Sequence, residues 1–253
     1  MCRIALLQTD VAWCRPEQNL AHLEPQIAAV DADLVVLPEM FATGFATDSA
    51  AAAEPTDGLV STTLRRWAGR YGKAVAGSVA VREDDRCRNR MYFATPDGDC
   101  TWYDKHHLFT PGGEADGYHP GRERCVVTFC GMRFLLLVCY DLRFPVWIRN
   151  RGDYDAILCC ASWPASRRDV WRTLLRARAI ENQCYVAGVN RVGHDPAAHY
   201  AGDSVLIDFR GRTLSEAGDG EQTLTAAFDL EALATFRAKF PVWRDADEFH
   251  LLK

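Results

Sequence analysis

The chain alternates between short apolar runs and longer segments in which apolar residues recur at helical spacing. Short apolar runs bounded by turn residues are typical of buried strands, and apolar residues three or four positions apart are typical of one helix face. The pattern predicts strands at 3–9, 33–38, 73–81, 89–95, 98–103, 124–130, 132–138, 155–160, 184–191, 203–209, 212–217 and 222–229. It predicts helices after Pro16, which suits a first helical turn, and at 58–71, 142–151, 167–182 and 230–238.

These elements are connected in two ways. Some neighbouring strands are joined directly by turn residues, at Pro96-Asp97-Gly98, at Gly131 and at Gly211. Helices separate other strands. A chain with both hairpins and helical crossovers suits two sheets covered by helices, so we expect a mixed α/β fold. Because the sequence contains no linker, we expect residues 1–253 to form a single domain, with 241–253 as a C-terminal tail.

Charge and hydropathy limit the classes of partner. The formal net charge of −5 gives no electrostatic reason to expect nucleic acid or an anionic membrane. No apolar run approaches the roughly 18 residues that a membrane-spanning helix needs, and residues 1–10 are typical of a first strand and not of a signal peptide. We therefore expect a soluble, cytoplasmic protein.

The ten cysteines are irregularly spaced, and none forms a Cys-x-x-Cys pair. Cys159 and Cys160 are adjacent, which makes it hard for both thiols to reach one metal ion from a strand. Without an export signal, reduced thiols are expected in place of a disulfide framework, and no metal site is predicted.

Three predicted strands end in reactive side chains. The apolar run 134–138 leads into Cys139, the run 34–37 into Pro38-Glu39, and the strand 98–103 into Asp104-Lys105. Ligands bind at the carboxyl ends of strands in open α/β sheets. Two irregular stretches, 43–55 and 111–121, follow Glu39 and Lys105 and are candidates to cover a substrate.

A thiol, a carboxylate and an ammonium group are sufficient for acyl transfer from an amide. The Cys139 thiolate is the candidate nucleophile, and Glu39 is the candidate general base that takes and returns the proton. Lys105 and the backbone N–H of Tyr140 are candidates to stabilise the oxyanion. This chemistry needs neither a metal ion nor an organic cofactor.

Three segments resemble the signature segments of the nitrilase, or carbon–nitrogen hydrolase, superfamily. They are Leu-Pro-Glu-Met-Phe at 37–41, Tyr-Asp-Lys-His-His-Leu-Phe at 103–109 and Val-Cys-Tyr-Asp-Leu-Arg-Phe-Pro at 138–145. The segment 176–183, Arg-Ala-Arg-Ala-Ile-Glu-Asn-Gln, resembles a further characteristic stretch. The resemblance extends along essentially the whole chain. It implies an αββα four-layer sandwich, a Glu39–Lys105–Cys139 mechanism, a second glutamate at Glu114 and a homodimer or higher homo-oligomer.

Within the superfamily, the residues look closest to the ω-amidase branch. The resemblance implies release of ammonia from the terminal amide of small 2-oxo dicarboxylic monoamides such as 2-oxoglutaramate, and of succinamate-like compounds. Because such substrates carry a carboxylate, a second cation is expected in the pocket. The candidates are Arg167, Arg168 and Arg191, and the candidate apolar walls are Phe41 and Trp163.

Other residues near these strand ends are assigned supporting roles. His106 and His107 are expected to be hydrogen-bonded neighbours of the site, because Glu39 already fills the role of base. Asp141 and Arg143 are expected to form ion pairs that fix the turn after Cys139. The pKa of Cys139 is expected to be lowered beside Lys105, although Glu39 opposes this, and the thiol is expected to be the first that iodoacetamide alkylates.

Several alternatives remain open. Another activity of the superfamily, as an aliphatic amidase, an N-carbamoyl amino acid hydrolase or a nitrilase, uses the same three side chains. A non-catalytic interaction protein of the same fold is a second class. A redox thiol protein, with Cys159 or Cys160 close to Cys139, is a third.

Overall fold

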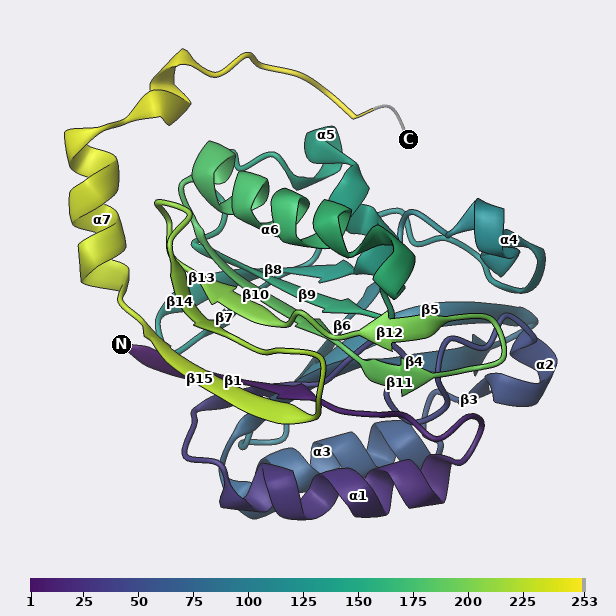
Figure 1. Ribbon diagram of the computed structural model, residues 1–253. Helices are drawn as coiled ribbons and strands as arrows, with labels where there is room; N and C mark the ends of the chain where they lie inside the picture. Colours follow the sequence, from purple (N-terminus) through teal and green to yellow (C-terminus); the bar gives the residue numbers. More distant parts are fainter. Residues whose placement is uncertain (252–253) are drawn as a thin grey trace.

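The computed structural model describes residues 1–251, which fold into two large sheets packed face to face (Figure 1). The first sheet has the order β15-β1-β2-β4-β5-β6, and β3 pairs with β4. Its strands are β1 (Cys2–Gln8), β2 (Leu34–Val36), β3 (Glu54–Pro55), β4 (Ala74–Glu83), β5 (Arg86–Ala94), β6 (Cys100–Asp104) and β15 (Gln222–Phe228). β1, β2 and β4 are parallel, so their carboxyl ends share one edge.

The second sheet has the order β14-β13-β10-β9-β8-β7. Its strands are β7 (Val126–Phe129), β8 (Met132–Val138), β9 (Ala156–Ala161), β10 (Tyr185–Asn190), β13 (Val205–Ile207) and β14 (Thr213–Glu216). β8, β9 and β10 are parallel, and a separate hairpin is formed by β11 (Val192–His194) and β12 (His199–Ala201).

Helices cover the outer faces of both sheets. The helices α1 (Pro16–Ala29) and α3 (Leu59–Tyr71) pack on the first sheet, and α6 (Arg168–Asn182) and α5 (Pro145–Ile148) lie over the second (Figure 1). The shorter α2 (Ser49–Ala52) and α4 (Glu114–Gly117) lie in loops, and α7 (Leu230–Lys239) lies at one side. The four layers are helices, sheet, sheet and helices, which confirms the predicted αββα sandwich.

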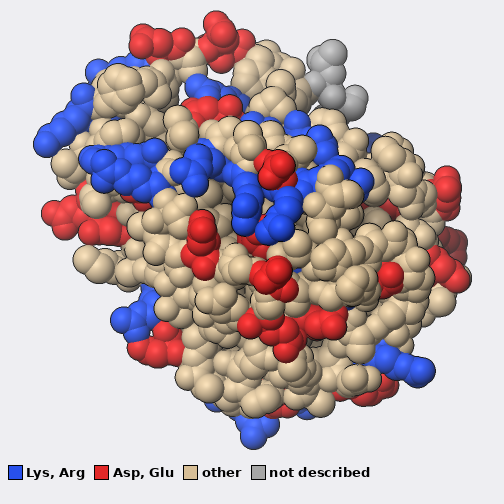
Figure 2. Space-filling view, in the orientation of Figure 1, with Lys and Arg blue, Asp and Glu red and all other residues tan. Residues whose placement is uncertain are grey.

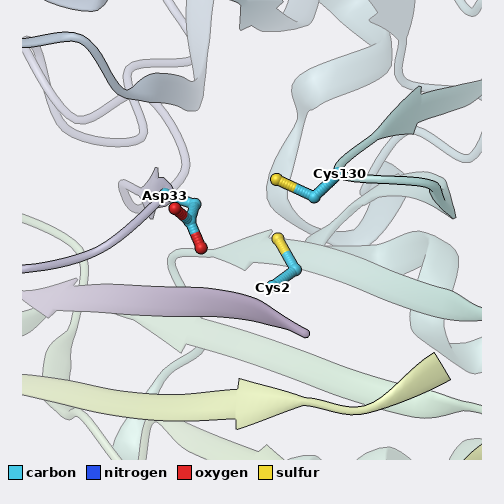
Figure 3. Close-up of side chains that lie close together, drawn as sticks. All are labelled: Cys2, Asp33 and Cys130. Carbon is cyan, nitrogen blue, oxygen red and sulfur yellow. The ribbon is translucent and has the colours of Figure 1, made fainter. Parts of the chain in front are cut away.

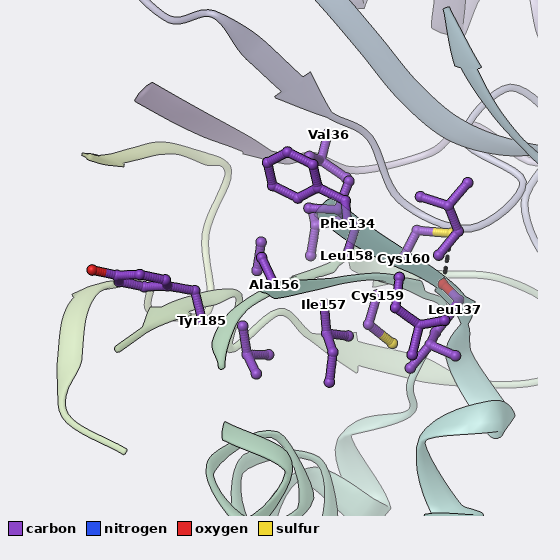
Figure 4. Packing of buried hydrophobic residues seen from close by; sticks show 14 of the residues in the cluster. Val36, Phe134, Leu137, Ala156, Ile157, Leu158, Cys159, Cys160 and Tyr185 are labelled. Carbon is purple, nitrogen blue, oxygen red and sulfur yellow. Dashed lines mark hydrogen bonds between the residues drawn. The ribbon is translucent and has the colours of Figure 1, made fainter. Parts of the chain in front are cut away.

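The strands of the second sheet are buried on both faces, as the alternation along β9 shows. Leu158 and Cys160 point towards Val36 of the first sheet, whereas Ile157 and Cys159 point to the opposite face (Figure 4). Successive side chains of a strand lie on opposite faces, so continuous apolar runs fill both the inter-sheet core and the contact with α6. The two adjacent thiols of β9 are separated in this way.

Several predicted elements are shorter in the structure. The predicted helix 142–151 is replaced by a 3-10 helix, Cys139–Arg143, and the single turn α5, because Pro145 begins a new helix and 149–153 turns back. The strand predicted at 203–209 is limited to β13. The predicted tail 241–253 contains the 3-10 helix Val242–Asp245, and its last two residues lie outside the described residues.

Basic side chains gather over the region of α6 among acidic ones (Figure 2). Two of them, Arg168 and Arg172, form ion pairs with Asp203. Within residues 1–251, no helix is both long enough and apolar enough to cross a membrane.

Candidate active site

Cys139 stands at the carboxyl end of β8 and begins the 3-10 helix Cys139–Arg143. Its φ of 46° lies in the left-handed region, which costs a non-glycine residue about 1–3 kcal/mol and is common at functional turns. The buried carboxylate of Asp141 holds this turn, because it accepts hydrogen bonds from the N–H of Val138 at 3.1 Å and the hydroxyl of Tyr103 at 2.9 Å. The turn therefore holds the thiol in one orientation.

Glu39 follows β2 and Lys105 follows β6, and their side chains meet at the same edge of the first sheet, across β4 and β5. Nζ of Lys105 lies 2.8 Å from Oε1 of Glu39, and both side chains are fully buried. The other carboxylate oxygen of Glu39 accepts the N–H of Ser162 at 2.8 Å, just beyond β9 of the second sheet. These bonds join strand ends of both sheets beside the thiol.

A second glutamate completes the surroundings of the ammonium group. Oε2 of Glu114 lies 2.8 Å from Nζ of Lys105 and also accepts the N–H of Phe109 at 2.6 Å. The amide of Asn89 donates to Glu39 at 2.8 Å and to Glu114 at 3.0 Å. Lys105 is therefore held between two carboxylates that one amide group links.

The electrostatics of this cluster favour a protonated lysine and a neutral thiol. Burial alone would lower the pKa of Lys105, but the charges of Glu114 and Glu39 raise it well above its usual value. Burial and then the charge of Glu39 raise the pKa of Cys139 well above its usual value, against the opposing charge of Lys105. This corrects the expectation from the sequence that the pKa of Cys139 is lowered. A neutral thiol is a weak nucleophile unless a neighbouring group accepts its proton.

The three side chains line one cavity of about 580 Å³. This volume lies within the range of sites for small molecules, roughly 300–1,000 Å³. Besides Glu39, Lys105 and Cys139, its lining includes Tyr140, Trp163, Phe45, Phe109, Trp13, Tyr200, Ser162, Arg143 and Arg167. Much of the cavity wall is aromatic, and besides Lys105 it carries two positively charged side chains, Arg143 and Arg167.

The two arginines of the cavity rest on its aromatic walls. The guanidinium of Arg143 lies 5.1 Å from the ring centroid of Trp163, and that of Arg167 lies 5.2 Å from the ring centroid of Phe109. Among residues 1–251, the ion pairs within 4.0 Å include neither arginine. Both are therefore available to an anionic group of a ligand.

Three predicted binding residues lie elsewhere. Phe41 is fully buried in the core under α1 and α3 and packs against Gly77, so it is not a wall of the cavity. Arg191 is fully buried; its guanidinium donates to Asp10 at 3.0 Å and lies 4.6 Å from the ring centroid of Tyr200. Arg168 is paired with Asp203. The predictions failed because the direction of a side chain beyond a strand end depends on how the loop turns.

The supporting roles are partly corrected. Nδ1 of His107 lies 2.9 Å from Oδ1 of Asp141, and Nδ1 of His106 lies 2.7 Å from the carbonyl oxygen of Gly121. Both imidazoles are therefore hydrogen-bonded neighbours of the site, as expected. The expected ion pair of Arg143 was wrong, because this side chain faces the cavity. Asp141 fixes the turn as expected, but through hydrogen bonds from Val138 and Tyr103.

Sequence reasoning did not identify Asn89 and Ser162. Asn89 interrupts the apolar side of β5, and its amide bonds two buried carboxylates. Ser162 follows the apolar run of β9 and donates its N–H to Glu39. A polar residue within or just after a buried run was the available signal.

Comparison with known proteins places these features in a family. Residues 3–238 match the family model described as carbon–nitrogen hydrolase. The omega-amidase YafV of Yersinia enterocolitica is 46% identical over 99% of this chain and 98% of its own, and the 2-oxoglutaramate amidase of Bacillus subtilis is 38% identical over 96% of both. The solved structure of XC1258 from Xanthomonas campestris, a CN-hydrolase superfamily protein with an arsenic adduct in the active site, superposes with a TM-score of 0.96. It is 45% identical, over 99% of this chain and 98% of that one.

Proposed function

Because this chain belongs to the carbon–nitrogen hydrolase family, and is thus a hydrolase of non-peptide carbon–nitrogen bonds, we propose that it acts as an ω-amidase. Its substrates are small 2-oxo dicarboxylic monoamides of the 2-oxoglutaramate type, and succinamate. The observation that carries the proposal is a buried Glu39–Lys105 pair beside Cys139, in a cavity that also holds two unpaired arginines. The names of the omega-amidase and 2-oxoglutaramate amidase relatives support the same class of substrate.

The first half of the reaction forms a thioester. Glu39 takes the proton of the Cys139 thiol as the sulfur attacks the amide carbon. Lys105 and the N–H of Tyr140 stabilise the negative oxygen of the tetrahedral intermediate. Glu39 then returns the proton to the amide nitrogen, which leaves as ammonia, and the acyl group remains on the sulfur.

The second half regenerates the enzyme. Glu39 takes a proton from a water molecule as its oxygen attacks the thioester carbon. A second oxyanion forms at the same donors and collapses, and the sulfur leaves as a thiol with the proton that Glu39 returns. The product is a carboxylic acid, so one water is consumed for each ammonia released. Glu114 and Asn89 position the Lys105 ammonium and the Glu39 carboxylate throughout.

The far carboxylate of the substrate binds to Arg143 and Arg167. Both guanidinium groups lie in the same cavity as the thiol, and a guanidinium can donate two parallel hydrogen bonds to a carboxylate. With its terminal amide at the thiol and its carboxylate at the arginines, the substrate is a short dicarboxylic monoamide.

The experiment that tests this function is a panel of substrates with released ammonia as the readout. The panel contains 2-oxoglutaramate, succinamate, an N-carbamoyl amino acid and an aliphatic nitrile. The highest kcat/KM is expected for 2-oxoglutaramate or succinamate. Turnover of the nitrile or the carbamoyl compound alone would reject the ω-amidase assignment in favour of another activity of the family. Absence of turnover in the whole panel would favour a non-catalytic or redox role.

The arginine assignment predicts a change in KM that depends on the charge of the substrate. Arg143→Gln and Arg167→Gln are each expected to raise KM for succinamate about 10–100-fold, because a hydrogen bond to a charged group contributes about 1.5–3 kcal/mol. KM for butyramide, which lacks the carboxylate, should change little. Arg172→Gln on α6, outside the cavity, is the matched control. An equal rise in KM for both substrates would mean that the arginines shape the cavity wall and do not bind the substrate carboxylate.

The proposal includes an oligomer in a reducing compartment, the cytoplasm. The exposed side chains of Ile180, Phe240 and Trp243, each with half or more of its surface exposed, are the candidates for a subunit contact. The reduced state of all ten thiols, Cys139 included, suits the cytoplasm. Light scattering coupled to gel filtration measures the oligomeric state, and a monomer at micromolar concentration would contradict a stable homodimer.

A further inference from the structure

Three potential metal ligands meet at the end of the sandwich opposite the active site. Cys2 begins β1, Asp33 directly precedes β2, and Cys130 lies in the turn before β8. Each is therefore at the amino end of a strand, whereas Glu39 and Cys139 follow the carboxyl ends of β2 and β8. The two thiols come from different sheets.

The ligand atoms of these residues converge. The two Sγ atoms and a carboxylate oxygen of Asp33 all lie within 4.8 Å of one another. Figure 3 shows the Cys2 thiol pointing towards that of Cys130, which in turn points towards Asp33. Oδ2 of Asp33 accepts the N–H of Arg3 at 2.7 Å, which fixes the carboxylate beside β1 and leaves Oδ1 for another partner.

Cys130 has a left-handed backbone conformation, which cysteine seldom adopts. The β7–β8 hairpin has a two-residue turn, Cys130-Gly131, and both residues have positive φ, 50° and 73°. Such turns favour Asn or Asp before Gly, because these residues tolerate the left-handed region best. The turn accounts for the positive φ of Cys130, and the choice of cysteine at this position places a thiol beside Cys2 and Asp33.

We propose that Cys2, Asp33 and Cys130 form a binding site for one thiophilic divalent cation of the zinc class. Thiolate and carboxylate are both zinc ligands, and two thiolates on a tetrahedral ion with Zn–S bonds of about 2.3 Å lie roughly 3.8 Å apart. The observed spacing needs only small side-chain movements to reach this geometry. Asp33 and Cys130 are exposed, so a water molecule from solvent can complete the tetrahedron. The proposal does not depend on the proposed amidase function.

Metal uptake at this site must release protons. Cysteine binds a metal ion as the thiolate, and a free thiol with a pKa of about 8.5 is mostly protonated at neutral pH. Binding replaces two S–H bonds by two metal–sulfur bonds and releases two protons to the buffer, so affinity rises with pH. The bound cation would connect the two sheets at the end where β1 and β8 begin.

No local motif predicts this site, because its successive ligands are 31 and 97 positions apart in the chain. The absence of a Cys-x-x-Cys pair excludes only sites built from one local segment. The expectation that the chain has no metal site is therefore replaced here by a specific candidate.

The test uses reduced, metal-free, full-length protein with Cys139→Ala, which removes the thiol of the cavity as a competing ligand. Titration with Co²⁺ under anaerobic conditions is expected to produce a sulfur-to-cobalt charge-transfer band that saturates at one equivalent. Zn²⁺ should displace the cobalt and abolish the band. The apparent affinity should increase between pH 6 and pH 8, as expected for proton release.

Variants of exposed residues make the test specific. Cys130→Ser and Asp33→Asn in the same background should weaken binding at least tenfold, and Cys130→Ser should also reduce the sulfur band. Cys14→Ser, which removes an exposed thiol elsewhere, is the matched control and should bind as the parent does. Circular dichroism and Tm of the metal-free variants confirm that they are folded.

Two outcomes would overturn the proposal. One is a sulfur band of unchanged intensity and affinity in Cys130→Ser. The other is a reduced protein that takes up no Co²⁺ but forms a Cys2–Cys130 disulfide under mild oxidation, as detected by peptide mapping without reductant. That result would make the pair a redox site and not a metal site.

Discussion

Cys139 and Met40 adopt left-handed backbone conformations, with φ of 46° and 45°, although neither is glycine. Met40 directly follows Glu39, so a left-handed residue lies at two of the three reactive strand ends. The N–H of Met40 donates to Oγ of Ser78 at 2.9 Å, and Asp141 holds the turn at Cys139. Local hydrogen bonds thus offset the strain that directs the thiol and the carboxylate into one cavity.

At the residue scale, Glu39→Gln is expected to lower kcat about 10²–10⁴-fold, because the amide cannot take the thiol proton. Tm should also fall, because the new NH2 group faces a donor, either Lys105 or the N–H of Ser162, and the buried ammonium loses one of its two carboxylates. Steady-state ammonia release measures the effect. Glu17→Gln, an exposed glutamate of α1, is the control. A kcat within a few-fold of wild type would remove Glu39 from the role of base.

The raised pKa of Cys139 predicts how its alkylation depends on pH. A thiol whose pKa lies above its usual value forms thiolate only at alkaline pH, and thiolate is the alkylated species. The rate of iodoacetamide modification at Cys139, followed by mass mapping, should therefore increase steadily from about pH 6 to pH 10. A rate that is already maximal at neutral pH would indicate a preformed thiolate and would restore the expectation drawn from sequence.

At the element scale, β6 and the loop that contains α4 are packed backbone to backbone. The N–H of Gly121 donates to the carbonyl of Lys105 at 2.9 Å, and a Cβ at position 121 would lie 2.1 Å from the carbonyl oxygen of Asp104. The loop also carries Glu114. Close packing at Gly121 therefore fixes both the lysine and the glutamate that holds it.

Gly121→Ala is accordingly expected to move the segment that carries Lys105. Overpacking of this kind costs about 1–3 kcal/mol of unfolding free energy, and kcat should fall as the ammonium leaves its position. Urea unfolding and ammonia release measure the two effects. Gly220→Ala, where a Cβ meets nothing within 4 Å, should leave both unchanged. Unaltered stability in Gly121→Ala would mean that the loop and β6 can separate freely.

At the scale of the whole molecule, Asp155 connects the second sheet to α7. Its carboxylate accepts hydrogen bonds from Arg133 of β8 at 2.8 Å and from Arg237 of α7 at 2.9 Å. Burial alone would raise the pKa of Asp155, but the hydrogen bonds from Arg133 outweigh it and hold the pKa below its usual value. The pair of arginines thus holds the C-terminal helix against the sandwich.

The pKa of Asp155 fixes the sign of a stability effect. A carboxyl with a lowered folded-state pKa contributes stability that is present above its unfolded pKa, near 4, and is lost as pH falls through the folded value. Asp155→Asn should cost about 1–3 kcal/mol at pH 7, and the difference from wild type should shrink below about pH 4. Urea unfolding at both pH values measures this. A difference that grows in acid would contradict the assignment.

The sequence determined most of the strands and helices, because each follows a local apolar pattern. It also determined the three reactive residues, because each lies at the end of an apolar run. Glu39, Lys105 and Cys139 could be identified in this way, and the resemblance to carbon–nitrogen hydrolases added Glu114. Local periodicity reports which residues are buried, so it also predicted two sheets covered by helices.

Only the tertiary structure decided which side chains face the same space. Phe41 and Arg143 both follow strand ends, yet the first packs in the core and the second lines the cavity, because loop geometry sets their directions. Asn89 became a link between two carboxylates only when β5 paired beside β6. Convergence of groups far apart in the chain depends on the packing of two sheets, which no local pattern encodes.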